Sequence, residues 1–323
     1  MKKILITGAC GFIGSHLTEM MIKKGYNVIA FDRYNSNNDY GWLNNSKYKK
    51  DIEFQLGDIR DFDSVYKVMK KVKTVFHLAA LIGIPYSYIS PLAYIKTNVE
   101  GTYNVLESSK ILNLENVVIT STSETYGSAM YTPMDEEHRL FGQSPYAASK
   151  ISADQVSLSY YNSFDTPIKL VRPFNVYGPR QDPTNPYSGV ISKFIDNILK
   201  GNSVTINGGF QTRDFIFVQD VVNVMVKSME LLHEKNICKN FNVGTGRSVT
   251  IDELFSLTKS ILNVEPEVIR KNLPYGDPER SAGTYTKIKE ILGVDISSFI
   301  DLQSGLIKTI EYFSDKNVAD SIK

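Results

Sequence analysis

A short apolar strand followed by regularly spaced glycines constrains the fold of this chain most strongly. Lys3–Thr7 is apolar enough for a buried strand, and the glycines after it lead into a helix that begins near Ser15. Glycines at this spacing let backbone amides approach a pyrophosphate at the N-terminus of a helix, where the helix dipole favours negative charge. We therefore predict a dinucleotide-binding βαβ unit whose cofactor-binding turn contains Gly8, Gly11, Phe12, Ile13 and Gly14.

An acidic residue ends the second predicted strand, Tyr26–Asp32. Asp32 lies 18 residues beyond Gly14, where the acid that binds the adenosine ribose is expected. A carboxylate at this position accepts from the ribose hydroxyls and repels a 2′-phosphate, so Asp32 favours NAD over NADP. Arg33 could hold such a phosphate and weakens the inference without reversing it. The sequence predicts NAD, with Asp32 and Arg33 beside it.

Strands and helices continue to alternate along the first half of the chain. Further strands are predicted at Asp51–Ile59, Thr74–Leu78, Val117–Thr120 and Ile168–Pro173, and helices at Asp61–Lys71 and Pro91–Leu112. This alternation predicts an α/β fold with a doubly wound parallel (Rossmann) sheet and a site at the carboxyl ends of its strands. The further cofactor-binding residues predicted from these segments are Asp58, Ile59, Leu78, Ala79, Ala80, Asn98 and Pro173.

The composition changes near Gln181, where a stretch rich in turn residues follows the last of these strands. Gln181–Gly189 contains two prolines. We place there the crossover into a smaller C-terminal substrate-binding domain. The prediction is an NAD-binding domain over residues 1–180, to which the chain returns at about 212–245, and a substrate-binding cap over 181–211 and 246–323.

Overall composition argues against several classes of partner. The 323 residues include 36 basic and 35 acidic ones, a net charge of +1, which indicates neither a nucleic-acid surface nor a membrane-binding tail. No apolar run approaches 18 residues. The two cysteines, Cys10 and Cys238, are interpreted as reduced thiols of a cytoplasmic protein. The four histidines lack metal-ligand spacing, so no metal is expected, and His77 is interpreted as a packed residue at a strand end.

A tyrosine and a lysine four residues apart predict a catalytic pair. On a helix, Tyr146 and Lys150 lie on one face. A phenol is a poor base at its normal pKa of about 10, but a nearby ammonium and a cationic nicotinamide would lower that pKa. Tyr146 could then accept a proton from a hydroxyl while hydride leaves the same carbon. Thr122, Ser123 and Glu124 follow a predicted strand and add two hydroxyls and an acid/base group.

Together, these motifs resemble extended short-chain dehydrogenases/reductases of the NAD-dependent epimerase/dehydratase family, which act on nucleotide sugars. The resemblance rests on Thr7-Gly8-x-x-Gly11-x-x-Gly14, Asp58, His77-Leu78-Ala79-Ala80, Tyr146-x-x-x-Lys150, Arg172-Pro173-x-Asn175 and Arg213-Asp214-Phe215. It implies that Tyr146 is the base, that Lys150 holds the nicotinamide ribose and that Thr122 binds the reacting hydroxyl. It also implies that the sugar diphosphate contacts Asn175, Arg213 and Arg280, for each of which a loop-bracing role is the alternative.

Within that family, the triplet Thr122-Ser123-Glu124 resembles 4,6-dehydratases, which need a carboxylate where plain 4-epimerases usually lack one. Ser123 replaces the Asp of deoxythymidine-diphosphate-glucose dehydratases, as in GDP-mannose dehydratases. Glu124 would therefore act first as base and then as acid, unless it merely caps the following turn. The retained NAD would be recycled in each turnover.

The stretch Ser121–Asp154 looks most like bacterial 4,6-dehydratases of nucleotide-activated N-acetylglucosamine in legionaminic acid biosynthesis. The resemblance favours a GDP-linked substrate, with a UDP-linked one as the alternative. It also implies a homodimer through a four-helix bundle built from Pro91–Leu112 and Ala147–Phe164 of each subunit.

Three other functions remain as alternatives. A UDP-glucuronate decarboxylase shares the Thr-Ser-Glu triplet, but its relatives generally carry basic residues and a Pro-Asp pair after the position of Arg280, where Ser281-Ala282-Gly283 stand here. A nucleotide-sugar 4-epimerase ranks third. A silent dinucleotide-binding sensor ranks last, because the catalytic side chains are intact.

Overall fold

A computed structural model describes residues 2–185, 189–232, 240–274 and 277–315. The chain divides into two compact units. The first consists of Met1–Thr125, Phe141–Arg172 and Val222–Phe241, and the second of Tyr126–Leu140, Pro173–Val221 and Asn242–Lys323. Within the described residues, no helix is long and apolar enough to cross a membrane.

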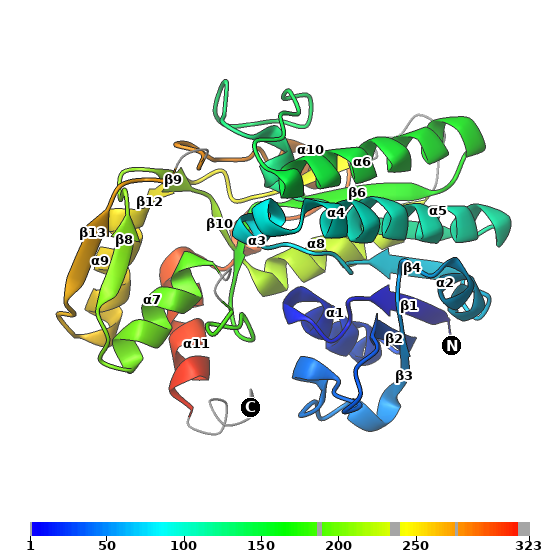
Figure 1. Cartoon of the computed structure of the whole chain (residues 1–323), viewed down its shortest axis with the longest axis horizontal. Helices are drawn as coiled ribbons and strands as arrows, with labels where there is room; N and C mark the ends of the chain where they lie inside the picture. The colour runs from blue at the N-terminus through cyan, green and yellow to red at the C-terminus, as the bar shows by residue number, and fades with distance from the viewer. Residues whose placement is uncertain (1, 186–188, 233–239, 275–276, 316–323) are drawn as a thin grey trace. The chain divides into compact units, whose positions relative to one another are not determined.

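The first unit is built on a seven-stranded parallel sheet with the strand order β11-β6-β5-β4-β1-β2-β3 (Figure 1). Its strands are β1 (Lys3–Thr7), β2 (Asn27–Arg33), β3 (Ile52–Gly57), β4 (Thr74–His77), β5 (Asn116–Thr120), β6 (Ile168–Pro173) and β11 (Asn240–Val243). Its helices are α1 (Phe12–Lys23), α2 (Phe62–Met69), α3 (Ile84–Ile89), α4 (Pro91–Tyr94), α5 (Gly101–Ile111), α6 (Pro145–Phe164) and most of α8 (Val218–Glu230). The predicted doubly wound α/β fold is confirmed.

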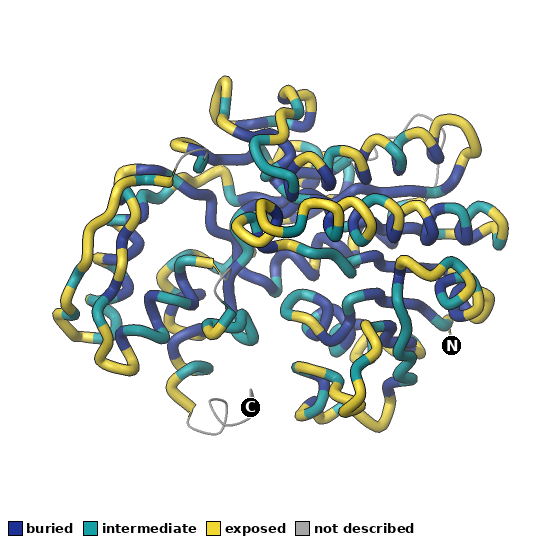
Figure 2. The backbone as a smooth tube through the Cα atoms, in the orientation of Figure 1, coloured by how far each residue is buried: buried dark blue, intermediate teal, exposed yellow. Residues whose placement is uncertain are grey.

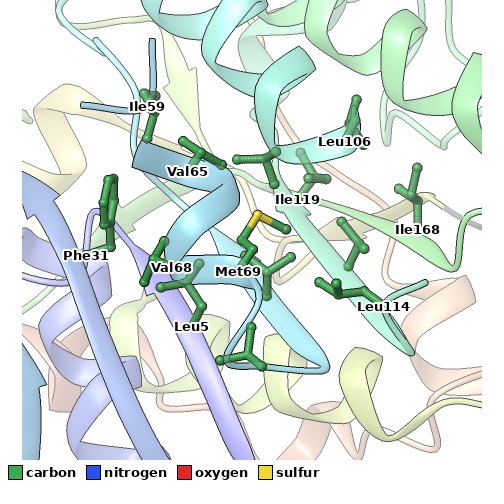
Figure 3. Close-up of a cluster of buried hydrophobic side chains, with 14 of the residues drawn as sticks. Leu5, Phe31, Ile59, Val65, Val68, Met69, Leu106, Leu114, Ile119 and Ile168 are labelled. Carbon is green, nitrogen blue, oxygen red and sulfur yellow. The ribbon is translucent and has the colours of Figure 1, made fainter. Parts of the chain in front are cut away.

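A hydrophobic core fills the space between this sheet and the layer of α2, α5 and α6 (Figure 3). Leu5 of β1 and Ile119 of β5 pack there against Met69 of α2 and Leu106 of α5. Because successive strand residues point to opposite faces, Ile4 is buried on the other side of the sheet, where α1 packs on β1 and β2. Figure 2 shows these strands as almost wholly buried, which explains why they read as continuous apolar runs.

The long helix predicted over Pro91–Leu112 is interrupted. It consists of α4, a π-helical segment over Ile95–Glu100, and α5. A π-helical turn has one more residue than an α-helical turn, and such segments occur frequently at functional sites. The segment contains Asn98, a predicted cofactor-binding residue.

Within its described residues, the second unit contains three two-stranded sheets, which pair β10 with β7, β12 with β9, and β13 with β8. These strands are β7 (Asn175–Tyr177), β8 (Val204–Asn207), β9 (Thr212–Arg213), β10 (Phe215–Phe217), β12 (Val249–Thr250) and β13 (Val268–Lys271). The helices are α7 (Val190–Leu199), α9 (Ile251–Leu262), α10 (Thr286–Glu290) and α11 (Leu302–Ser314).

Single 3₁₀ turns occur in both units, at Gly41–Leu43, Lys49–Asp51, Ser123–Tyr126 and Ile296–Ser298.

The second unit begins earlier than the predicted crossover at Gln181. It starts at Pro173 and also takes Tyr126–Leu140. The reason is a backbone pairing that the sequence did not reveal: Met134 donates to the carbonyl of Ala282 at 2.7 Å and accepts from the N–H of Thr284 at 2.8 Å. The segment after the predicted catalytic loop is therefore held by the C-terminal part of the chain.

One buried carboxylate organises the loops of the second unit. Asp214 is fully buried and accepts hydrogen bonds from the backbone N–H groups of Thr245, Gly246 and Gly283 and from the Thr245 hydroxyl. Burial raises the pKa of Asp214, and these hydrogen bonds oppose that rise. The residue thus ties β9 and β10 to two loops that lie far away in the sequence.

We expect Asp214→Ala to lower the free energy of unfolding by at least about 3 kcal/mol, because several donors to a charged group lose their acceptor. Urea denaturation of both proteins measures this. The control is Asp301→Ala, which removes an exposed helix cap on the N–H of Ser304 and should cost only about 1 kcal/mol. Equal losses in the two variants would contradict this role for Asp214.

Candidate active site

The glycine turn after β1 has no room for side chains at two of its positions. Gly8 has φ +69°, and a Cβ atom there would lie 2.8 Å from the backbone nitrogen of Ala79. A Cβ atom on Gly14 would lie 2.1 Å from the carbonyl oxygen of Gly8. Gly11 is less restricted, since its nearest contact would be at 3.4 Å. The turn therefore packs tightly against the end of β4 and leads into α1 at Phe12 and Ile13, as a pyrophosphate cradle requires.

Asp32 lies directly beside this turn. Its carboxylate accepts the backbone N–H of Cys10 at 2.8 Å and that of Arg33 at 2.8 Å. Burial raises the pKa of the Cys10 thiol, and the charge of Asp32 raises it further. An acid fixed next to the glycine turn has the position expected of a ribose-binding group.

The end of β3 places Asp58 and Ile59 near the same edge of the sheet. Arg60 donates to the Asp58 carboxylate through its backbone N–H and its side chain, which lowers the pKa of Asp58. Ile59 is buried, and its carbonyl accepts from the Asn104 side chain at 2.9 Å. Nothing in the sequence pattern predicted the pairing of Arg60 with Asp58.

A hydroxyl that the sequence analysis did not single out organises the end of β4. The Thr7 hydroxyl accepts from the backbone N–H groups of Leu78 and Ala79, each at 3.2 Å, and lies 2.8 Å from Nδ1 of His77. Burial lowers the pKa of His77 to about 3, and Lys150 acts in the same direction, so the imidazole is neutral. His77 is thus a packed strand-end residue.

Asn98 braces the loop after β4. Its side-chain oxygen accepts from the N–H of Leu81 at 2.8 Å, and its amide donates to the carbonyl of Leu81 and to the hydroxyl of Ser149, both at 2.9 Å. Ala79 and Ala80 in this loop are half-buried. Asn98 therefore holds the predicted cofactor-binding loop against α6, and its polar atoms all have partners within the protein.

Tyr146 and Lys150 lie on one face of α6, which begins at Pro145 after a Ser144 cap. Both are buried, and Lys150 donates to the carbonyl of Thr120 at 2.7 Å. Burial lowers the pKa of Lys150, whereas Asp154 raises it.

The prediction that Lys150 and a cationic nicotinamide lower the pKa of Tyr146 applies to the cofactor-bound protein, and the protein's own groups act on that pKa in both directions. Burial raises the pKa of this phenol; a hydrogen bond with Thr122 lowers it, and Glu124 adds to the rise. The physical reason is that the phenolate loses its hydration, while Lys150 is directed to the Thr120 carbonyl. A cation supplied by a cofactor would oppose this rise.

The loop after β5 brings two predicted catalytic groups to Tyr146. The Thr122 hydroxyl hydrogen-bonds the Tyr146 side chain and also accepts the N–H of Glu124 at 3.2 Å. Glu124 is half-buried and close enough to affect the Tyr146 phenol electrostatically. Ser123 is buried. A hydroxyl, a phenol and a carboxylate therefore converge, as acid–base chemistry on a hydroxyl-bearing carbon requires.

Apart from Thr122, the predicted substrate-binding residues belong to the second unit. Oδ1 of Asn175 on β7 is buried without a hydrogen-bond partner in the described part of the chain. Arg213 on β9 is buried and donates to Asp277 and to the carbonyl of Pro278. Arg280 is exposed. The carboxylate of Asp277 beside Arg213 is a competitor for any anion, which the sequence analysis did not foresee. Pro173 is the last residue of β6.

The residues of the first unit fit a bound dinucleotide. The tight turn at Gly8 and Gly14, the acid Asp32 next to it and the buried pair Tyr146 and Lys150 all follow strands of the one parallel sheet. No group of three or more His, Cys, Asp or Glu residues that could hold a metal ion occurs among the described residues.

Comparisons with known proteins agree with this geometry. A UDP-N-acetyl-α-D-glucosaminuronate decarboxylase of Bacillus cytotoxicus is 31% identical, over 97% of this chain and 98% of that protein. The UDP-glucose 4-epimerase of Thermotoga maritima, solved with UDP-glucose, superposes with a TM-score of 0.88 at 34% identity, over 96% of this chain and 98% of the other. An NAD-dependent NDP-hexosamine 5,6-dehydratase of tunicamycin biosynthesis gives a TM-score of 0.85 at 26% identity, over 99% of this chain and 100% of the other.

The family model described as GDP-mannose 4,6 dehydratase matches residues 5–293, nearly the whole chain. Its relatives are dehydratases, decarboxylases and 4-epimerases of nucleotide sugars, and the cofactor is NAD. The chain belongs to this family of NAD-dependent, nucleotide-sugar-modifying short-chain dehydrogenases/reductases.

Proposed function

We propose that the protein is a cytoplasmic NAD-dependent 4,6-dehydratase of a nucleotide-activated N-acetylglucosamine. The observation that carries the proposal is Glu124, whose backbone N–H donates to the Thr122 hydroxyl and whose carboxylate acts electrostatically on Tyr146. Oxidation at C4 needs only one proton acceptor, and Tyr146 is that acceptor. Elimination of water from C5 and C6 needs a second group that takes one proton and gives another. Glu124 is suited to that task, and the neighbouring Ser123 is too weak an acid for it.

The chain's own residues would handle the protons as follows. Thr122 hydrogen-bonds the C4 hydroxyl, and Tyr146 accepts its proton as the ketone forms. The ketone acidifies the C5 proton, which Glu124 removes. Glu124 then protonates the C6 hydroxyl, which leaves as water. The proton that Tyr146 took from the C4 hydroxyl balances the proton that C5 regains when the hydride reaches C6. A bound NAD would supply the hydride chemistry between C4 and C6, with no net oxidation of the sugar.

Asn175, Arg213 and Arg280 are the proposed contacts to the sugar nucleotide. Oδ1 of Asn175 has no hydrogen-bond donor within the described residues, and a hydroxyl of the ligand can donate to it. Arg213 is already oriented by Asp277, and its planar guanidinium suits a diphosphate. The resemblance of the catalytic stretch favours GDP over UDP and a place in legionaminic acid biosynthesis.

A UDP-glucuronate-type decarboxylase is the second candidate, because a relative with that kind of activity is 31% identical over nearly the whole chain. Decarboxylation also begins with oxidation at C4, but it needs no group to eliminate water. The two activities therefore differ in whether Glu124 must transfer protons for the elimination of water. They also give products of different mass.

The first prediction tests the reaction itself. Incubated with GDP- or UDP-N-acetylglucosamine and no added cofactor, the purified protein should yield a product lighter by one water, about 18 Da, because the retained NAD is regenerated in each turnover. Mass spectrometry of the sugar nucleotides measures this. Unchanged hexosamine substrates, together with loss of carbon dioxide from UDP-glucuronate, would establish the decarboxylase instead.

A second prediction separates the two proton acceptors. In Glu124→Gln, C4 oxidation should persist and NADH absorbance should accumulate, while dehydration falls by about 10²–10⁴-fold. In Tyr146→Phe, both should be lost. Glu137→Gln is the matched control, because that carboxylate is 84% exposed. Full dehydration by Glu124→Gln would show that Glu124 is only a turn cap.

We further propose a homodimer through α6 and the segment Pro91–Leu112, which contains α4, the π-helical segment and α5. Large apolar side chains are exposed beside these helices: Leu92 (61%), Ile95 (53%), Tyr103 (44%) and Ile111 (46%). Figure 2 shows exposed positions along both helices. Such side chains are the expected signature of a covered surface.

The double variant Leu92→Glu/Ile95→Glu should therefore be monomeric in light scattering, whereas the native protein is dimeric. Ile307→Glu, which changes an exposed apolar residue of α11, is the control and should leave the dimer intact. A native protein that is monomeric in the same measurement would contradict the proposed homodimer.

A further inference from the structure

A third ionisable residue extends the catalytic face of α6. Tyr146, Lys150 and Asp154 are spaced four residues apart and so lie along one side of the helix. Asp154 has no exposed surface, and Arg172, its partner on β6, is only 1% exposed. The ion pair lies entirely within the first unit.

The contacts of Asp154 are concentrated on one of its oxygens. Oδ2 accepts the Ser121 hydroxyl at 2.8 Å and both Nε and Nη2 of Arg172 at 3.0 Å. Oδ1 is buried and has no hydrogen-bond partner among the described residues. The carboxylate thus joins α6, the end of β5 and β6, but half of its hydrogen-bonding capacity is unused.

Stability alone does not account for such a pair. A buried ion pair is commonly no more stabilising than apolar residues of the same size, and an unsatisfied buried oxygen is costly. Ser121, which donates to Asp154, immediately precedes Thr122 in the catalytic loop, and the same helix face carries the proposed base. The position of the pair next to both suggests a role in the reaction.

We propose that Asp154 is a positioning residue that holds the end of β5 against α6 and, with Arg172, sets the balance of charge around Tyr146 and Lys150. Its negative charge favours the ammonium of Lys150 and disfavours the phenolate of Tyr146. Arg172 offsets part of both effects. The groups that act on the pair or on Tyr146 from the surrounding elements are Thr122 and Glu124 after β5, Tyr94 of α4 and Lys150 of α6. His77 of β4 interacts in turn with Lys150.

The inference rests on Tyr146 being the base of the proposed function, but its test needs no sugar nucleotide. Tyrosine labelled with ¹³C at Cζ is titrated by NMR from pH 6 to pH 11 in the NAD-bound protein, and Tyr146→Phe assigns the signal. Eight residues along a helix span about 12 Å. At an effective dielectric constant of about 20, loss of one charge at that distance moves a titration midpoint by about one pH unit.

In Asp154→Asn, the midpoint of Tyr146 should therefore fall by about one pH unit. Glu107→Gln is the matched control, because Glu107 accepts from Tyr160 near the other end of α6, at 2.6 Å, and its loss should leave Tyr146 unchanged. The double variant Asp154→Leu/Arg172→Met removes both charges, guards against misfolding of the single variant, and should shift Tyr146 less. An unchanged midpoint in Asp154→Asn, or a native Tyr146 that does not ionise by pH 11, would overturn the proposal.

Discussion

The close approach of the glycine turn to the end of β4 is the constraint on which the first unit depends. Gly8 leaves no space for a side chain next to Ala79, and Gly14 leaves none next to Gly8. The Thr7 hydroxyl then satisfies two backbone donors of the following loop. Because the strands are parallel, their carboxyl ends share this one edge, so the dinucleotide cradle and the loop after β5 are placed by the same sheet.

Burial shifts the pKa values of both members of the proposed catalytic pair, Tyr146 and Lys150. Tyr146 and Lys150 both lose hydration, so each is pushed towards its neutral form. Burial thus disfavours the phenolate, which is the form of Tyr146 that accepts a proton. Binding of a cationic nicotinamide would change that balance, which ties the activation of Tyr146 to the presence of the cofactor.

The sequence predicted the bounds of helices and strands well. It predicted poorly which polar side chains form hydrogen bonds and ion pairs with one another. Lys3–Thr7 and Ile168–Pro173 have the predicted bounds, because one apolar run is followed by Gly8 and the other ends at a proline. The π-helical segment in Ile95–Glu100 changes the backbone but not the apolar pattern, so periodicity could not detect it.

Partnerships that join distant segments left no local signal in the sequence. The pairing of Arg213 with Asp277 joins residues 64 apart, and that of Asp154 with Arg172 joins neighbouring elements of the fold, so both needed the structure.

The same limit applies to the reaction. Epimerisation, decarboxylation and dehydration all begin with oxidation of C4, so a shared cofactor site and base cannot distinguish them. The distinction lies in a second proton acceptor, and Glu124 is the residue whose position beside Tyr146 gives dehydration a physical basis.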